Sequence, residues 1–99
     1  CDYNNMQSMD TKDNTLSIEP FADRIKSFGW SVKEVDGNNV DELEKTLSQI
    51  PFEKGKPSFV IAHAVKGKGI SFAENQVAWH YKNLTEEQYE RATRELEQA

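Results

Sequence analysis

The chain has 99 residues, 36% of them hydrophobic, and a formal net charge of −5. This length suits one small domain or a piece of a larger one, and the acidic charge argues against nucleic-acid binding, which usually needs a basic face. No apolar stretch reaches the roughly 20 residues of a membrane helix, and the single cysteine excludes an internal disulfide framework. Because no secretory signal is visible, a reducing cytoplasm is the expected location. The chain begins at Cys1 rather than methionine, so we expect further sequence upstream.

The N-terminal part of the chain predicts a loop followed by a helix. Residues 1–15 are polar and rich in Asn and Asp, which is typical of a loop. A helix is predicted over 17–28, with Ser17 as its cap and Gly29 as its stop. Apolar residues recur at helical spacing and give this helix one face to bury: Ile18, Phe21, Ala22, Ile25 and Phe28.

The middle of the chain predicts a right-handed βαβ unit. β-forming residues over 30–35 indicate a strand. A helix is predicted over 39–50, where Asn39 and Glu42 have the spacing of a capping box. The run over 58–65 is almost continuously apolar, as expected for a parallel strand that is covered on both faces. The helix has apolar residues on one face: Val40, Leu43, Leu47 and Ile50.

The C-terminal part predicts a loop over 66–83 and a final helix. Thr85 and Gln88 have the spacing of a second capping box. Tyr89, Ala92 and Leu96 would share one face of this helix. With the βαβ unit before it, the whole chain is expected to have an α/β fold built on a parallel sheet with flanking helices.

The sequence KGKG directly follows the buried strand, at the sheet edge where ligands of open α/β sheets usually bind. Lys66 and Lys68 offer positive charge, and Gly67 and Gly69 would let backbone amides approach an anion closely. The pattern is not a Walker A loop. Taken alone, the segment fits a solvated turn better than a phosphate-binding loop.

Other polar residues are ambiguous one at a time. His80 lies in a loop, where an imidazole can orient a hydroxyl group or move a proton near neutral pH, but a surface histidine is the simpler interpretation. His63 falls within the strand and is expected to be a hydrogen-bonded core residue or a residue that supports a ligand. Asp2 and Asn4 offer oxygen ligands suited to Mg²⁺, as many polar loops do.

Taken together and in order, the motifs resemble the thiamine-diphosphate-binding domain of transketolases, above all the N-terminal subunit of split transketolases. The resemblance covers essentially the whole chain, so residues 1–99 are interpreted as the C-terminal portion of such a domain. It also favours the phosphate-binding interpretation of KGKG. The matching segments are DYNNMQ at 2–7, FGW at 28–30, VDG at 35–37, KP at 56–57, VKGKGI at 65–70, WHYK at 79–82 and LTEEQY at 84–89.

The resemblance implies a set of site residues. Asn4 matches an asparagine ligand of Mg²⁺, and Met6 would supply a second ligand through its main-chain carbonyl. Lys66 matches a lysine near the diphosphate of thiamine diphosphate. His80 matches a loop histidine close to the diphosphate and to the hydroxyls of the donor sugar, which makes it the expected catalytic residue.

The resemblance also implies an enzyme that transfers a two-carbon ketol unit between sugar phosphates, as in the pentose phosphate pathway. This chain alone is expected to be incomplete, because the aspartate ligand of the family motif GDG is absent. The expected partner is a C-terminal, pyrimidine-binding subunit or domain, within a homo- or hetero-oligomer.

Two alternatives remain open from the sequence. One is another thiamine-diphosphate enzyme, similar to a deoxyxylulose-phosphate synthase. The other is a non-catalytic interaction module that keeps the fold. Tyr81 stands where the family usually has glycine and favours the second alternative, because it would narrow access for substrate. Ala64 replaces a usual threonine, and Asp10 stands near a usual glycine.

Overall fold

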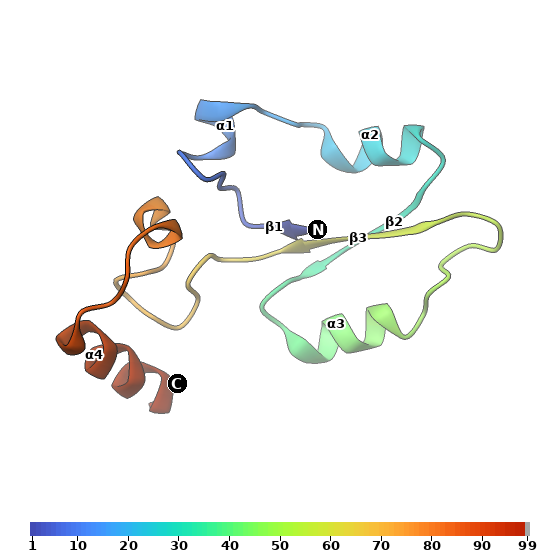
Figure 1. The fold of residues 1–99 in the computed structure, drawn as a ribbon. Coiled ribbons are helices and arrows are strands. Elements are labelled where there is room, and N and C mark those ends of the chain that lie inside the picture. The colour runs from blue at the N-terminus through green and yellow to red at the C-terminus, as the bar shows by residue number, and fades with distance from the viewer. Residues whose placement is uncertain (99) are drawn as a thin grey trace.

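The computed structural model describes residues 1–98 and has the predicted α/β fold (Figure 1). Three strands form one sheet in the order β1 (Asp2–Tyr3), β3 (Ser58–His63), β2 (Ser31–Asp36), and both pairs are parallel. Residues 1–15 were expected to be a loop, but they contain β1 and the short helix α1 (Lys12–Thr15). A two-residue strand is too short to show alternation, so it depends on β3 for its hydrogen bonds rather than on a local pattern.

The central βαβ unit is confirmed, with a shorter helix and a shorter second strand than predicted. β2 leads into α3 (Val40–Leu47) and then into β3, and β2 and β3 pair from Ser31↔Ser58 to Asp36↔His63. The cap at Asn39 is formed, since its Oδ1 accepts the backbone N–H of Glu42 at 3.1 Å. The reciprocal half of the capping box is absent, because the Glu42 carboxylate accepts the N–H of Asp36 instead, at 3.3 Å.

The helix predicted over 17–28 starts later than expected. α2 (Phe21–Ser27) begins after Pro20, so Ser17 is not its cap. The Glu19 carboxylate instead accepts the N–H of Phe21 at 3.0 Å and satisfies one of the free amides of the first turn. Gly29 has a positive φ of 85°, which confirms it as the stop that the sequence predicted.

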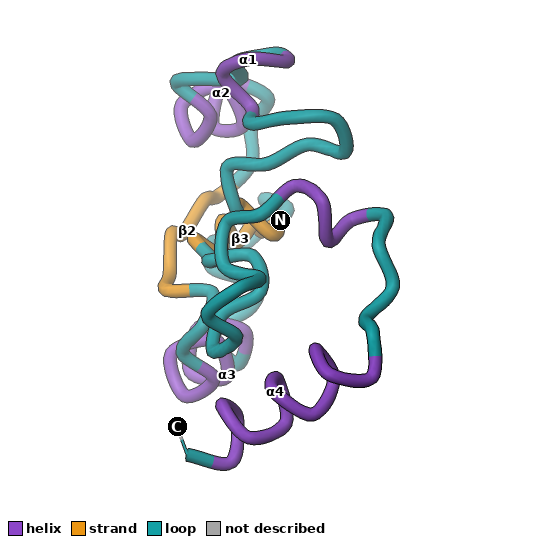
Figure 2. Tube along the Cα trace, turned by 90° about the vertical axis from the view of Figure 1, so that its left-hand side faces the viewer, coloured by secondary structure: helices purple, strands orange, loops and turns teal. Residues whose placement is uncertain are grey.

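The two larger helices near the sheet lie on opposite faces of it, α2 on one side and α3 on the other (Figures 1 and 2). The core between these layers is small. Among the described residues only Val35, Ile61, Ala73 and Ala92 are buried apolar side chains. The expectation that 58–65 is covered on both faces is therefore wrong for most of the strand, since only Ile61 is fully buried.

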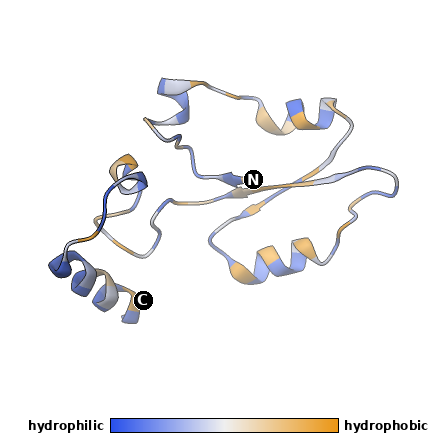
Figure 3. Cartoon of the chain, in the orientation of Figure 1, coloured by the Kyte–Doolittle hydropathy of each residue, from blue (hydrophilic) through white to orange (hydrophobic). Residues whose placement is uncertain are grey.

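Apolar side chains remain exposed beside this core, and the ribbon of α3 includes hydrophobic residues (Figure 3). On α3, the expected buried face is mostly open, because Val40 is 74% exposed and Leu47 is 51% exposed. The radius of gyration is 16.4 Å, whereas a compact domain of this length is expected near 13 Å. The helix α3 is amphipathic in sequence, but few side chains in residues 1–98 pack against its apolar face.

The last elements lie beyond the carboxyl ends of the strands (Figure 1). They are a 3₁₀ turn, η1 (Val77–His80), and α4 (Glu86–Glu97). The capping box of Thr85 and Gln88 is confirmed in both directions. α4 is attached to the preceding loop through Glu95, whose carboxylate accepts the N–H and the hydroxyl of Ser71 at 2.6 and 2.8 Å. No helix in residues 1–98 combines the length and the apolar character needed to cross a bilayer.

Candidate functional site

All four residues expected at the site line one pocket at the carboxyl end of the sheet. The pocket has a volume of about 230 Å³ and is lined by three separate segments. The turn after β1 brings Asn4 and Met6, the segment after β3 brings Lys66, and η1 brings His80. The complete lining is Asp2, Asn4, Met6, Gln7, Ser8, Lys66, Val77 and His80.

The turn after β1 fixes the amide of Asn4 at both ends. Its Oδ1 accepts the N–H of Met6 at 3.0 Å, and its Nδ2 donates to the Asp2 carboxylate at 3.0 Å. Asn5 next to it has a positive φ of 61°, which asparagine tolerates better than most residues. These two bonds determine the orientation of the amide, so Asp2 acts on Asn4 rather than as a free oxygen ligand. The Asn4 oxygen keeps one lone pair for a cation.

The main-chain carbonyl of Met6 is left free by the hydrogen bonds of this turn. Met6 forms an antiparallel bridge with Thr11. The bonds that flank the bridge run from the Gln7 N–H to the Asp10 carbonyl at 2.8 Å and from the Lys12 N–H to the Asn5 carbonyl at 2.9 Å. The Met6 carbonyl accepts neither, so it remains available as an oxygen ligand.

The KGKG segment separates into one candidate cation and a structural turn. Lys66 forms no ion pair among residues 1–98, whereas Lys68 lies 3.9 Å from the Glu74 carboxylate. The N–H of Gly69 is used within the loop, because it donates to the Glu74 carboxylate at 3.0 Å. Gly67 has a φ of +74°, and a Cβ there would lie 2.7 Å from the Ala73 carbonyl oxygen. A glycine at position 67 therefore allows the loop to pack closely against Ala73.

His80 lies at the end of η1 with its side chain exposed. The Tyr81 ring packs edge-on against the imidazole, with 5.0 Å between the ring centroids. The Tyr81 hydroxyl donates a hydrogen bond to the carbonyl of Ser8, which lines the pocket from the turn after β1. Trp79 anchors η1 through its Nε1, which donates to the Phe72 carbonyl at 3.0 Å.

Asn38 was missed by the sequence reasoning and supports this site. Its Oδ1 accepts the N–H of Val65, immediately before Lys66, at 2.7 Å. The N–H of Gly37 donates to the His63 carbonyl at 2.8 Å, and a Cβ on Gly37 would lie only 3.0 Å from the Cβ of Ala62. The turn after β2 therefore holds the backbone that leads from β3 to Lys66. The sequence DGN signals the turn, but not the long-range bond.

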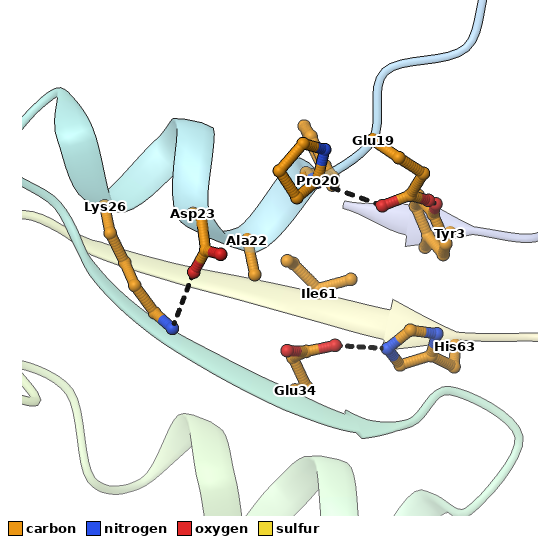
Figure 4. A pocket seen from close by; sticks show the side chains of 10 residues that line it. Tyr3, Glu19, Pro20, Ala22, Asp23, Lys26, Glu34, Ile61 and His63 are labelled. Atoms are coloured by element: carbon orange, nitrogen blue, oxygen red, sulfur yellow. Dashed lines mark hydrogen bonds and ion pairs between the residues drawn. The ribbon is translucent and has the colours of Figure 1, made fainter.

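His63 belongs to a different pocket, between α2 and the sheet (Figure 4). The expectation of a core histidine is wrong, since its side chain is 48% exposed. The imidazole is nevertheless hydrogen-bonded, because its Nε2 lies 2.7 Å from the Glu34 carboxylate. Tyr3 packs edge-on against the ring, and the Tyr3 hydroxyl donates to Glu19.

The pocket of Asn4 and His80 has the donor set for a hard cation bound to a phosphate group. The Asn4 and Met6 oxygens are ligands that Mg²⁺ accepts, and Lys66 supplies a positive charge for an anion. Within residues 1–98, no group of three or more His, Cys, Asp or Glu side chains is arranged to hold a metal ion. A site made by this chain would therefore need further ligands, such as the phosphate oxygens and water that Mg²⁺ commonly retains.

Comparison with known proteins matches nearly the whole chain. A family model described as the transketolase thiamine diphosphate binding domain matches residues 2–97. The 6-deoxy-6-sulfo-D-fructose transketolase subunit SqwG of Clostridium sp. (strain MSTE9) is 41% identical over 97% of this chain. An apulose-4-phosphate transketolase subunit of Phocaeicola vulgatus is 38% identical over 96% of it. The transketolase of Rattus norvegicus is 33% identical over 96% of it.

The chain spans only part of these relatives. It covers 35% of the length of the Clostridium protein, 34% of the Phocaeicola protein and 15% of the rat protein.

Proposed function

Because the chain belongs to the family of transketolase thiamine diphosphate-binding domains, we propose that it forms the diphosphate side of a transketolase-type active site. The reaction would transfer a two-carbon ketol unit between sugar phosphates. One observation carries this proposal: Asn4, Met6, Lys66 and His80 come from three separate segments and line the same pocket. In this proposal the chain is the C-terminal portion of the cofactor-binding domain.

Each residue on the diphosphate side has a separate task in this proposal. The Asn4 Oδ1 and the Met6 carbonyl would bind Mg²⁺, with Asp2 holding the Asn4 amide in position. Lys66 would bind the diphosphate, since it has no competing ion pair among residues 1–98. The cofactor, when bound, supplies the carbanion chemistry that breaks and forms the carbon–carbon bond.

His80 would act on the donor sugar. Its imidazole is exposed at the pocket and can donate or accept a hydrogen bond at a donor hydroxyl, or move a proton from it. The Tyr81 ring packs edge-on against the imidazole, with 5.0 Å between the ring centroids, and would help to orient it. Alignment of the donor is therefore the main contribution proposed for this histidine.

A partner is part of the proposal. The Clostridium and Phocaeicola relatives are both named as subunits of a transketolase. We propose that a pyrimidine-binding subunit or domain completes the site, within a homo- or hetero-oligomer. The exposed apolar residues of α3 and α4 are consistent with further protein packing against this chain.

Cofactor binding tests the proposal in the full-length protein. Calorimetric titration with thiamine diphosphate in the presence of Mg²⁺ should show binding, and Asn4→Ala and Lys66→Ala should each weaken it about 10- to 100-fold, the cost of losing a hydrogen bond to a charged group. Lys68→Ala is the matched control and should bind like the wild type, because Lys68 faces Glu74. Equal losses for both lysine variants would contradict the assigned role of Lys66.

The same experiment separates the alternatives. Binding without ketol transfer to any sugar phosphate would favour another thiamine-diphosphate enzyme, such as a deoxyxylulose-phosphate synthase. No binding by the wild type would favour the non-catalytic interaction module. Tyr81 is the observation that supports the non-catalytic alternative, because its ring and hydroxyl occupy the space beside His80.

A further inference from the structure

Two walls of the pocket are anchored separately, each within its own segment. The wall from Asn4 to Ser8 is held by the turn bonds and by the Gln7 Nε2, which donates to the Leu16 carbonyl at 3.1 Å. The wall from η1 is held by the bond of Trp79 to Phe72. Neither set of bonds fixes the distance between the walls.

The Tyr81 hydroxyl joins the two walls. It donates to the Ser8 carbonyl, 73 residues away in the sequence, and both Ser8 and His80 line the pocket. The Tyr81 ring also packs edge-on against the His80 imidazole. Tyr81 itself does not line the pocket. One side chain therefore contacts both the wall that carries Asn4 and Met6 and the histidine on the other wall.

We propose that Tyr81 is a positioning residue that sets the width of this pocket. Its hydroxyl holds the Met6–Asp10 turn against η1, and its ring holds the His80 imidazole. The expected consequence is a fixed separation between the cation-binding oxygens and the imidazole. The identity of the ligand in the pocket rests on the proposed function, whereas the connection between the two walls does not depend on it.

Two substitutions separate the hydroxyl from the ring. Tyr81→Phe removes the bond to Ser8 and keeps the ring against His80, whereas Tyr81→Ala removes both. Tyr89→Phe is the matched control, because Tyr89 is an exposed tyrosine of α4 whose hydroxyl makes no hydrogen bond with residues 1–98.

Hydrogen exchange of the ligand-free, full-length protein measures the connection. Tyr81→Phe should speed amide exchange about 2- to 10-fold, the effect of one lost hydrogen bond, in both 4–11 and 77–82. Segments of α3 should not change, and Tyr89→Phe should leave both walls at the wild-type rate. Faster exchange in 77–82 alone, or in neither segment, would overturn the proposed connection.

Cofactor binding measures the positioning. Tyr81→Phe should raise the Kd of thiamine diphosphate with Mg²⁺ by about the same 2- to 10-fold, and Tyr81→Ala should raise the KM of the donor more than Tyr81→Phe does. Faster exchange in both segments together with an unchanged Kd would overturn the positioning role but would support the connection between the two walls. If the wild type binds no thiamine diphosphate, the proposed function fails and the positioning role with it, while the exchange rates still decide the connection.

Discussion

Six consecutive residue pairs join β2 to β3, whereas the segments at and beside the pocket are connected by single side-chain bonds. Backbone pairing between β2 and β3 repeats along both strands, so five residue pairs remain if one is lost. The pocket has no such redundancy. Asn38 alone bonds the N–H of Val65, and Tyr81 alone bonds the carbonyl of Ser8.

This difference separates stability from function in the chain. The two larger buried apolar side chains of residues 1–98, Val35 and Ile61, lie in the strands. The candidate ligands are on turns, where single hydrogen bonds position them: Asn4 is held by its neighbours Asp2 and Met6, and the segment of Lys66 by the more distant Asn38. Substitutions in the first region should change the free energy of unfolding, and those in the second should change binding and turnover.

The largest effect is expected for His80→Ala in the full-length, assembled enzyme. Groups that transfer protons or align reacting groups contribute roughly 10²- to 10⁴-fold, so kcat/KM should fall by about that factor while cofactor affinity changes less. His63→Ala is the comparison variant, since His63 pairs with Glu34 in the other pocket. It should lower the melting temperature more than the turnover. Wild-type kinetics for His80→Ala would contradict the site.

Ile61→Ala should give the largest loss of stability. Ile61 is 1% exposed in the middle of β3, and truncating a buried isoleucine costs about 2–5 kcal/mol. Denaturant unfolding of the full-length protein should show this loss. Val40→Ala is the comparison variant, because Val40 is 74% exposed on α3 within residues 1–98. A loss within about 0.5 kcal/mol, as for surface substitutions, would mean that α3 stays open in the full-length protein. A comparable loss for Val40→Ala would show that other parts of the protein cover α3.

Most of the scaffold was predictable from the sequence because its signals are local. Alternation and apolar runs identified β2 and β3, and spacing between polar residues identified the caps at Asn39 and Thr85. β1 was not predictable, because its two residues form a strand only by pairing with Ala62 and His63. The start of α2 was misplaced for a similar reason: Glu19, not Ser17, satisfies the first amides.

The candidate site was predictable as a set of residues but not as an arrangement. The family resemblance placed Asn4, Met6, Lys66 and His80, and the structure brings all four to one pocket. The bonds that hold Asn4 are local to its turn, but no local pattern indicates the bonds that connect the separate segments. The contact of Tyr81 with Ser8 spans 73 residues, and that of Asn38 with Val65 spans 27. From the sequence, Gly67 and Gly69 were expected to let backbone amides approach an anion. Their close packing against Ala73 and Leu96 could not be predicted, because these contacts exist only in the folded loop.

Gly67→Ala tests how closely the loop after Lys66 is packed. A residue with a side chain at φ +74° costs about 1–2 kcal/mol, and the new Cβ would also lie 2.7 Å from the Ala73 oxygen. Gly55→Ala is the matched control, because Gly55 has a φ of +83° and nothing within 4 Å of the added Cβ. Unfolding measurements should show a larger loss for Gly67→Ala than for Gly55→Ala. Equal losses would mean that the loop adjusts freely.

The smallest effect concerns the attachment of α4 at low pH. The Ser71 N–H, the Arg91 guanidinium and the Ser71 hydroxyl all donate to the Glu95 carboxylate and hold its pKa below the ordinary glutamate value. Because the folded pKa is the lower one, the carboxylate stabilises the attachment above the ordinary pKa. This stabilisation is lost as the pH falls through the folded pKa.

Amide exchange in residues 69–73, corrected for the intrinsic dependence of exchange on pH, should follow this titration. Protection in the wild type should be highest above the ordinary glutamate pKa and should decrease as the pH falls below it. Glu95→Gln should remove the carboxylate and make the corrected profile flat. Glu90→Gln is the matched control, since Glu90 lies on the same helix and faces Arg94 at 3.7 Å rather than Ser71. It should keep the wild-type profile. If protection in Glu95→Gln still decreased as the pH fell, another acidic group would attach α4 to the loop that contains Ser71.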